Sequence, residues 1–333
     1  MLYSAGVSRA VITGLLLLWA GGAQAQVAPI EVNATPIPVD RFEPGGARRF
    51  GPLEFRGGLV LSSPSANFGG ISGLVVQPDG ADFRAITDKG MWLAGRIEAE
   101  GDRPTGISGA QMAPMLAAKD RSFARDKRGD VESLARTPTG YVVGIERRQE
   151  VWSFPAGPLT APGKRLIADP ALMALGNNEG PEALLAPPGA TPAPIIVIGE
   201  QSPSDPAVLP GFLFDPAAKP ALIGRFTITR VDEFSATDAA ISDDGQVYLL
   251  ERRYDALRGV ALRLRRFPLA EIREGAVITG QTLLQANRAA SIDNMEAIAL
   301  HRNAAGELII TLMSDDNFSP LQRTLLLRFA VVE

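Results

Sequence analysis

The fold is decided by the stretch Asp293-Asn294-Met295-Glu296-Ala297-Ile298-Ala299, in which an acidic residue leads a short apolar strand. Four earlier segments have a similar pattern, at residues 72–76, 131–135, 181–185 and 237–241. Taken at positions 73, 132, 182, 238 and 296, the five copies are separated by 59, 50, 56 and 58 residues. Recurrence at such a period indicates a fold that is built from repeated units.

Each copy continues in the same way, through a turn with Gly or Pro into a second apolar strand that ends in a carboxylate. These second strands are expected at residues 83–88, 141–146, 195–200, 247–251 and 308–315. A third strand follows every copy and a fourth follows most of them, and the near-continuous apolar character indicates strands buried on both faces. Four antiparallel strands at this period predict an all-β fold, a β-propeller of about five four-stranded blades. A degenerate sixth blade within residues 101–130 is left open.

The last copy reaches the end of the chain after its third strand. Residues 53–62 form a strand-like segment that precedes the first copy, and we expect it to supply the missing fourth strand and close the ring. The alternative is a β-sandwich, which also contains many short strands. A sandwich gives no reason for the repeated acidic and apolar unit, so the propeller is favoured.

The first 25 residues have the pattern of a secretory signal peptide. Arg9 precedes an apolar run over residues 10–20, and Ala23-Gln24-Ala25 resembles a cleavage site. The run is shorter than the roughly 20 residues that a membrane span needs, so no stable membrane anchor is expected. We predict cleavage after Ala25, a periplasmic or secreted protein, a Pro-rich linker over residues 26–49 and a propeller domain over residues 50–333.

Composition excludes several kinds of site. The chain has no cysteine and one histidine, His301, so a Cys-ligated metal or a zinc with several imidazole ligands cannot form. The net charge of -4 and the scattered arginines argue against a nucleic-acid partner. His301 is expected in an exposed loop at the end of the propeller away from the acids, and Trp92 and Trp152 are expected in the core between blades. The oligomeric state is left open.

Carboxylates occupy two repeated places that must meet in space. Because the second strand of a blade runs antiparallel to the first, the start of the first and the end of the second lie at one mouth of the central channel. The first strands contribute Glu132, Glu182, Asp238 and Glu296, and the second strands contribute Asp88, Glu146, Glu200, Glu251 and Asp315. Like charges at this density are unfavourable unless a cation, a proton or an arginine offsets them.

This crowding predicts a site for a divalent cation, with Ca²⁺ favoured because it prefers carboxylate oxygens. The expected ligands are Asp88, Glu132, Glu182, Glu200, Glu251, Glu296 and Asp315. Glu132, Glu296 and Asp88 are the expected catalytic residues, with the ion activating a water molecule for attack. Arg147, Arg252, Arg253 and Arg323 are expected to bind the anionic part of a substrate. The alternative is that the acids only form ion pairs that hold the blades together.

Several motifs together resemble the phytase-like family, the "esterase-like activity of phytase" domain of exported bacterial proteins. They are Gly69-Gly70-Ile71-Ser72-Gly73-Leu74, Thr87-Asp88-Lys89-Gly90, Asp130-Val131-Glu132-Ser133, Leu250-Glu251-Arg252-Arg253, Asn294-Met295-Glu296-Ala297 and Ser314-Asp315-Asp316-Asn317-Phe318. The resemblance covers about residues 55–329 and carries over to the acids Asp88, Glu132, Glu251, Glu296 and Asp315. It implies a propeller with hydrolase activity on phosphate esters or other esters, and the related Ca²⁺-dependent propeller phytases bind their ions through carboxylates.

Whether the protein is an enzyme remains open from sequence alone. The leading hypothesis is a metal-dependent hydrolase that acts on a small anionic or ester substrate at the acidic mouth. One alternative is a propeller that binds a ligand or partner without chemistry, and another is a hydrolase of the lactonase type.

Overall fold

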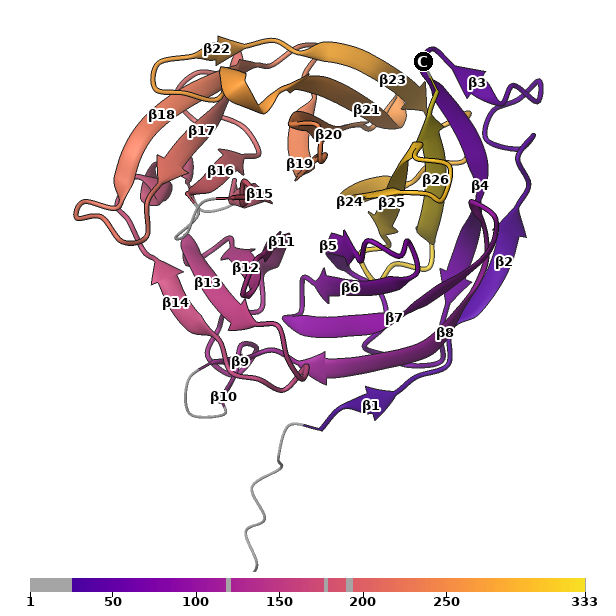
Figure 1. Ribbon diagram of the computed structural model, residues 1–333, viewed down its shortest axis with the longest axis horizontal. Coiled ribbons are helices and arrows are strands. Elements are labelled where there is room, and N and C mark those ends of the chain that lie inside the picture. The colour runs from indigo at the N-terminus through magenta and orange to yellow at the C-terminus, as the bar shows by residue number, and fades with distance from the viewer. Residues whose placement is uncertain (1–25, 118–120, 177–178, 190–193, 333) are drawn as a thin grey trace, which may run out of the picture.

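Five sheets surround a common axis, and β5, β11, β15, β19 and β24 are the strands nearest to that axis (Figure 1). This computed structural model describes residues 26–117, 121–176, 179–189 and 194–332. Within them the fold is all-β, with two short 3₁₀ helices, Leu172–Leu175 and Leu269–Glu271. The predicted five-bladed β-propeller is confirmed. The predicted signal peptide lies outside the described residues, and no described helix is long and apolar enough to span a bilayer.

The blades follow the order of the chain. Blade 1 contains β5 (Ile71–Val76), β6 (Asp82–Thr87), β7 (Met91–Glu100) and β8 (Arg103–Pro114), with β1 (Ala28–Pro29) at its edge. Blade 2 contains β11 (Val131–Thr137), β12 (Gly140–Ile145), β13 (Glu150–Pro155) and β14 (Lys164–Ile167). Blade 3 contains β15 (Pro181–Leu185), β16 (Ile195–Gly199), β17 (Val208–Phe214) and β18 (Leu222–Thr229), with β22 (Val277–Ile278) at its edge. Blade 4 contains β19 (Ser235–Ile241), β20 (Gln246–Asp255), β21 (Gly259–Pro268) and β23 (Gln281–Asn287).

Blade 5 joins the two ends of the described chain. It contains β24 (Asn294–Arg302), β25 (Leu308–Asp315), β26 (Thr324–Val331), β4 (Leu53–Ser62) and β2 (Asn33–Ile37), and β3 (Arg49–Phe50) pairs with β4. β4 runs antiparallel to β26, with Leu59 opposite Leu326 and Phe55 opposite Phe329. The predicted closing strand over residues 53–62 is therefore confirmed.

Residues 101–130, where a sixth blade was left open, do not form one in their described part. Within residues 101–130, β8 completes blade 1, and β9 (Leu116–Ala117) pairs with β10 (Arg121–Ser122) in a small hairpin. No further inner strand occurs in the described part of this region.

Residues 26–49 are part of the propeller, and the prediction of a linker was wrong. β2 pairs along β4, and β1 pairs with β8. The prolines that suggested a linker fit here because an outer strand can leave an N–H position unused. Phe42 is fully buried, and its ring lies 5.0 to 5.1 Å from the rings of Phe50, Phe55 and Phe329.

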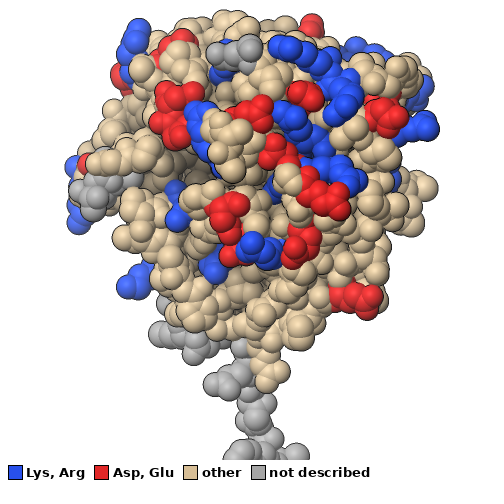
Figure 2. Space-filling view, turned by 45° about the vertical axis from the view of Figure 1, so that its right-hand side comes forward, with Lys and Arg blue, Asp and Glu red and all other residues tan. Residues whose placement is uncertain are grey.

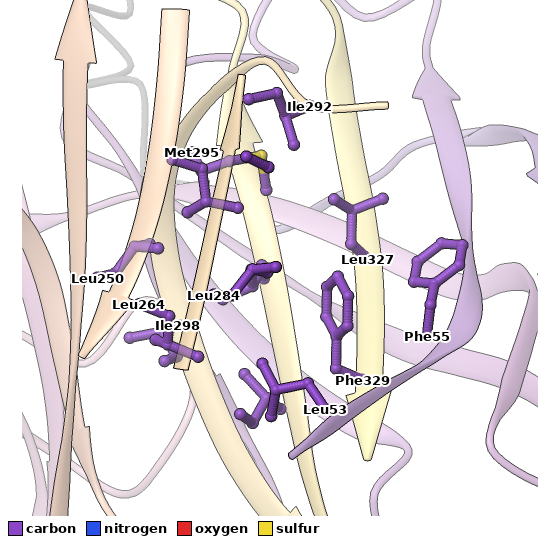
Figure 3. Packing of buried hydrophobic residues seen from close by; sticks show 14 of the residues in the cluster. Leu53, Phe55, Leu250, Leu264, Leu284, Ile292, Met295, Ile298, Leu327 and Phe329 are labelled. Carbon is purple, nitrogen blue, oxygen red and sulfur yellow. The ribbon is translucent and has the colours of Figure 1, made fainter. Parts of the chain in front are cut away.

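The hydrophobic core is divided into five clusters, each between two neighbouring blades. Figure 3 shows the cluster between blades 4 and 5, in which Leu250 and Leu264 approach Met295 and Ile298. Both faces of each blade are thus buried, as the continuous apolar strands predicted. Trp92 and Trp152 belong to the cluster between blades 1 and 2, which confirms their core role.

The buried position of Phe42 makes a testable prediction about the N-terminal segment. Phe42→Ala removes a ring from a closed aromatic cluster, and we expect it to lower the free energy of unfolding by about 3 kcal/mol. Arg41→Ala changes the adjacent exposed side chain and should alter stability by less than about 0.5 kcal/mol. Denaturant unfolding of both variants measures the difference. Equal stability of the two variants would show that this segment is not packed on blade 5.

Candidate functional site

A β-bulge occurs near the start of every innermost strand. In each case the pairing with the second strand skips one residue, so two residues oppose one. The skipped residues are Ser72, Glu132, Glu182, Thr237 and Glu296. These five positions are therefore structurally equivalent, and three of them carry a glutamate.

The bulge corrects the placement of Asp238. Thr237 occupies the bulge of blade 4, and Asp238 lies one residue later on a buried face. The Asp238 carboxylate accepts hydrogen bonds from the backbone N–H groups of Ala239 and Ile298, both at 2.8 Å. It therefore joins blade 4 to blade 5 and lies apart from the other acids. A shift of one residue moves a strand side chain to the opposite face, which accounts for the error.

The ends of the second strands form a second ring of equivalent positions. The backbone N–H of Asp88 bonds to Gly70, and that of Glu146 bonds to Asp130, one residue beyond each ladder. In blade 4 the corresponding pair is Ser235 and Arg252. The equivalent residues are Asp88, Glu146, Glu200, Arg252 and Asp315. An arginine thus occupies the place where the other four blades have a carboxylate.

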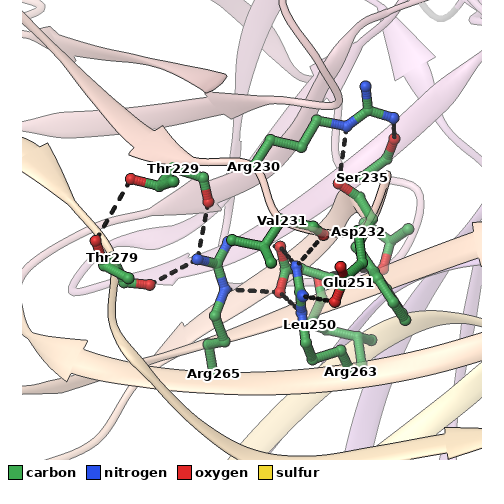
Figure 4. Close-up of polar contacts among 12 residues, drawn as sticks. Thr229, Arg230, Val231, Asp232, Ser235, Leu250, Glu251, Arg263, Arg265 and Thr279 are labelled. Atoms are coloured by element: carbon green, nitrogen blue, oxygen red, sulfur yellow. Dashed lines mark hydrogen bonds and ion pairs between the residues drawn. The ribbon is translucent and has the colours of Figure 1, made fainter. Parts of the chain in front are cut away.

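Glu251 lies on the other face of the same strand and is fully buried. Its carboxylate pairs with Arg263 at 2.8 Å and with Arg265 at 2.5 and 2.7 Å, as Figure 4 shows. Arg265 also donates to the carbonyl oxygens of Thr229 and Thr279. The expectation that Glu251 is a metal ligand is not met by this geometry, because two guanidinium groups already occupy both of its oxygens.

Three carboxylates of blade 2 come close together at the acidic end. Single oxygens of Asp130, Glu132 and Glu146 lie within 4.8 Å of one another, and all three residues are half-buried. Glu132 was an expected ligand, whereas Asp130 and Glu146 were not assigned as ligands. The pattern Asp130-Val131-Glu132 contained the signal, since two acids flank one buried residue at the start of an inner strand.

We call these residues and their acidic neighbours the acidic cluster. It consists of Asp88, Asp130, Glu132, Glu146, Glu182, Glu200, Glu296 and Asp315. Burial, together with the neighbouring carboxylates, raises the pKa of Asp88 to about 6, that of Glu146 to about 7 and that of Asp315 to about 8. The same causes raise the pKa values of Glu132 and Glu182 well above the usual range.

Arg252 is the guanidinium group within this cluster. It lies 3.6 Å from a Glu296 oxygen and 3.8 Å from a Glu200 oxygen. Burial acts to lower the pKa of Arg252, but Glu296 and Glu200 raise it above its usual value. Burial also raises the pKa values of Glu200 and Glu296, while Arg252 acts to lower them. This one partly buried cation therefore offsets only part of the negative charge of the cluster.

The other predicted substrate-binding arginines lie farther out. Arg147 is largely exposed and pairs with Asp130. Arg253 stacks on Phe234, 4.9 Å from the ring centre, and Arg323 pairs with Asp293 at 3.3 Å. On the face that Figure 2 shows, acidic and basic side chains are interspersed. Among the four predicted arginines, Arg252 is the one that contacts two members of the acidic cluster.

Glycines lie where a larger side chain would collide with the carboxylates of the acidic cluster. Gly70 has a φ of +63°, in the left-handed region, and a side chain there would collide with the Asp88 carboxylate. A side chain at Gly180 would meet Glu146 in the same way. The Gly69-Gly70 motif is thus explained by the approach of the acids.

His301 lies at the far end of β24 from Glu296, which agrees with its expected location away from the acids. It is not an exposed loop residue as expected, because it is the penultimate residue of β24 and only 8% exposed. It has no contact with the acidic cluster.

No curated protein matches the sequence. Among solved structures, an endo-arabinase from Bacteroides thetaiotaomicron VPI-5482 is similar at 9% identity and a TM-score of 0.46, over 81% of this chain and 95% of that chain. A Cellvibrio cellulosa alpha-L-arabinanase complexed with arabinohexaose is similar at 12% identity and a TM-score of 0.42, over 77% and 90% of the two chains.

The family comparison covers most of the propeller. The Phytase-like model, described as "Esterase-like activity of phytase", matches residues 66–318. This range includes every member of the acidic cluster and all five bulges. The chain therefore belongs to the Phytase-like family.

Proposed function

We propose that this protein is an exported hydrolase that acts on a phosphate ester or another ester at the acidic cluster, with a divalent cation as cofactor. The observation that carries the proposal is the meeting of the Asp130, Glu132 and Glu146 carboxylates within 4.8 Å. Oxygen ligands at this spacing suit a hard cation, and Ca²⁺ is the preferred ion because it accepts many carboxylates in flexible geometry. The family membership supports a hydrolase.

The electrostatics of the cluster support a bound cation. A buried carboxylate without a nearby positive charge tends to keep its proton, which raises its pKa. The raised pKa values of Asp88, Glu146 and Asp315 therefore indicate that the cluster has too little positive charge. Acids that served only as ion-pair partners would resemble Glu251, which is matched by two arginines. In the described structure, Arg252, which is partly buried, is the one arginine that contacts two members of the acidic cluster. The cluster is therefore better suited to receive a cation than to join blades.

Each side chain near the triad has a role in this proposal. A cation held by Asp130, Glu132 and Glu146 would supply Lewis-acid activation of water and of the substrate oxygen. Arg252 would hold the anionic group of the substrate, and Glu296 would fix the guanidinium by its ion pair. Asp88, with a pKa of about 6 and one carboxylate oxygen without a hydrogen-bond partner in the described structure, is suited to accept a proton near neutral pH.

Export completes the proposal. The pattern of residues 1–25 supports a cleaved signal peptide that ends at Ala25, and thus a periplasmic or secreted location. The millimolar Ca²⁺ found outside cells suits a site built from carboxylates alone.

The proposal is tested on the purified chain from Gln26 onward. Elemental analysis identifies the bound metal, and a panel of phosphomonoester, phosphodiester, phytate, carboxylic ester and lactone substrates is assayed with Ca²⁺ and with chelator. Turnover that requires the cation supports the hydrolase. Cation binding without turnover on any substrate would favour a non-catalytic binding propeller, and turnover of lactones alone would favour the lactonase alternative.

The triad makes a first prediction about cation affinity. Glu132→Gln and Glu146→Gln each remove a ligand and a charge, and we expect each to weaken Ca²⁺ binding at least about tenfold. Glu182→Gln is the matched control, because it changes the equivalent bulge residue of the next blade and removes charge without removing a triad ligand. Its effect should be smaller in calorimetric titration. Equal losses in all three variants would show that the cation is held by the whole ring.

Arg252 makes a second prediction, in which two measurements move in opposite directions. Arg252→Gln removes a positive charge from the cluster and should strengthen Ca²⁺ binding. The same change should lower kcat/KM on a phosphate ester by about tenfold or more, because the substrate anion loses a charged partner. A neutral ester should be affected less. A uniform loss on charged and neutral substrates would contradict the proposed contact.

The raised pKa values make a third prediction about pH. In the absence of cation, the folded cluster holds more protons than the unfolded chain between about pH 4 and pH 8, so the free energy of unfolding should fall as the pH rises through this window. Ca²⁺ should restore stability, and more so at pH 8 than at pH 5, since it competes with protons. Melting curves with and without chelator measure both trends. A Ca²⁺ effect that is independent of pH would contradict the prediction.

A further inference from the structure

A cavity of about 740 Å³ lies at the opposite end of the propeller from the acidic cluster, between blades 5 and 1. Its wall includes Gly80 and Asp102 from blade 1 and His301, Asn303 and Arg328 from blade 5. None of these residues takes part in the proposed hydrolytic site. The cavity therefore needs an explanation of its own.

Arg328 is a buried cation without an ion-pair partner. It is 2% exposed, and one terminal nitrogen donates to the Gly80 carbonyl oxygen. Its Nε has no hydrogen-bond partner, and no carboxylate of the described residues lies within ion-pair distance. Arg263 and Arg265 are buried to the same degree, but they share Glu251. Asp102 acts on Arg328 only from beyond ion-pair distance, so Arg328 lacks the directly paired anion that Arg263 and Arg265 have, and an unpaired buried charge is costly.

Two further unpaired polar groups lie on the same face of blade 5. Thr311 is directly opposite Arg328 in the ladder of β25 and β26, and its buried Oγ1 has no hydrogen-bond partner among the described residues. His301 lies two residues along β24 from Ala299, which is opposite Thr311, so alternation places it on this face too. The buried Nδ1 of His301 likewise has no hydrogen-bond partner in the part of the chain that the structure describes. Buried polar groups are nearly always hydrogen-bonded, so three together indicate a missing ligand.

The charges around the cavity select the kind of ligand. Burial and the neighbouring Arg328 lower the pKa of His301 to about 4, so the imidazole is neutral at physiological pH and can donate one N–H. Arg328 supplies one positive charge at the wall, and the Thr311 hydroxyl lies opposite Arg328 without being part of the wall. Asp79 and Asp102 on the wall are negative, and they disfavour a dianion such as phosphate.

We propose that this cavity binds the carboxylate group of a small organic ligand, held by the Arg328 guanidinium and the His301 imidazole of its wall and by the Thr311 hydroxyl, which lies opposite Arg328 in the sheet. A carboxylate matches one guanidinium in charge and accepts two parallel hydrogen bonds from it. The site would be separate from the hydrolytic one, at the other end of the axis. It does not depend on the proposed activity.

The chain contains one histidine, which makes His301 a specific reporter. Protein without a histidine tag is titrated with acetate at constant ionic strength, and the imidazole signals are followed by NMR. We expect a saturable shift and an upward movement of the His301 pKa from about 4, because a bound anion offsets Arg328. Asp79 and Asp102 also act on the imidazole, but their effect on the His301 pKa is the same in every titration, whichever anion is added. Chloride and inorganic phosphate are the comparison arms.

Variants separate binding from structure. Arg328→Gln should abolish the saturable shift, and Thr311→Val, which keeps the side-chain shape, should weaken acetate binding by about fivefold or more. Arg96→Gln is the matched control, because Arg96 lines the same cavity but is half-exposed and paired with Asp82 at 2.7 Å. Its acetate binding should equal that of the wild type. If Arg328→Gln does not fold, Thr311→Val and the comparison of anions still decide.

Three results would overturn the proposal. The first is a non-saturable response of His301 to acetate, which would mean that water alone fills the cavity. The second is an equal response to chloride or a stronger one to phosphate, which would exclude carboxylate recognition. The third is unchanged acetate binding in a folded Arg328→Gln or Thr311→Val variant.

Discussion

The β-bulge at the start of each innermost strand is the constraint on which the acidic site depends. Most of the remaining residues of these strands lie on one of two buried faces, because each blade packs against a neighbour on both sides. The bulge inserts one residue that has no opposite partner on the second strand, so its side chain is not bound to either buried face. In three blades that residue is a glutamate, and in blades 1 and 4 it is a hydroxyl residue. Ser72 and Thr237 use their hydroxyls to bond to the carbonyl oxygens of Val131 and Met295 in the next blade.

The same constraint separates acids that join blades from acids that gather at the axis. Asp238 and Glu251 each lie one residue away from the equivalent positions of blade 4, which are Thr237 and Arg252. Both carboxylates are fully buried, Asp238 bonded to backbone N–H groups and Glu251 paired with arginines. Glu132 and Glu146 lie at the ring positions and share their surroundings with other carboxylates. A difference of one residue in register thus decides whether a carboxylate stabilises the fold or is available to a ligand.

Sequence predicted the architecture well because the signals of a propeller are long-range and repeated. The period, the five copies and the closing strand all follow from apolar pattern, which tolerates an error of one residue. The site was predicted less completely because it does not tolerate that error. Asp130 and Glu146 were not assigned as candidate ligands, and Asp238 and Glu251 were misplaced, since no pattern in one sequence reveals a bulge. The segment over residues 26–49 was taken for a linker because it is rich in proline, and the single buried residue Phe42 gives no periodic apolar pattern.

Closure of the ring by β4 has a consequence for how the protein folds. Blade 5 pairs residues near the start of the described chain with residues near its end, so it contains the contacts with the greatest sequence separation. Loop-closure entropy must be overcome before these contacts contribute, and topologies rich in such contacts fold slowly. Until β26 pairs with β4, blade 5 is not closed, and the ion pair between Glu296 of β24 and Arg252 of blade 4 is not fixed from the blade-5 side. The acidic cluster is therefore complete only after β4 and β26, from the two ends of the described chain, have paired in blade 5.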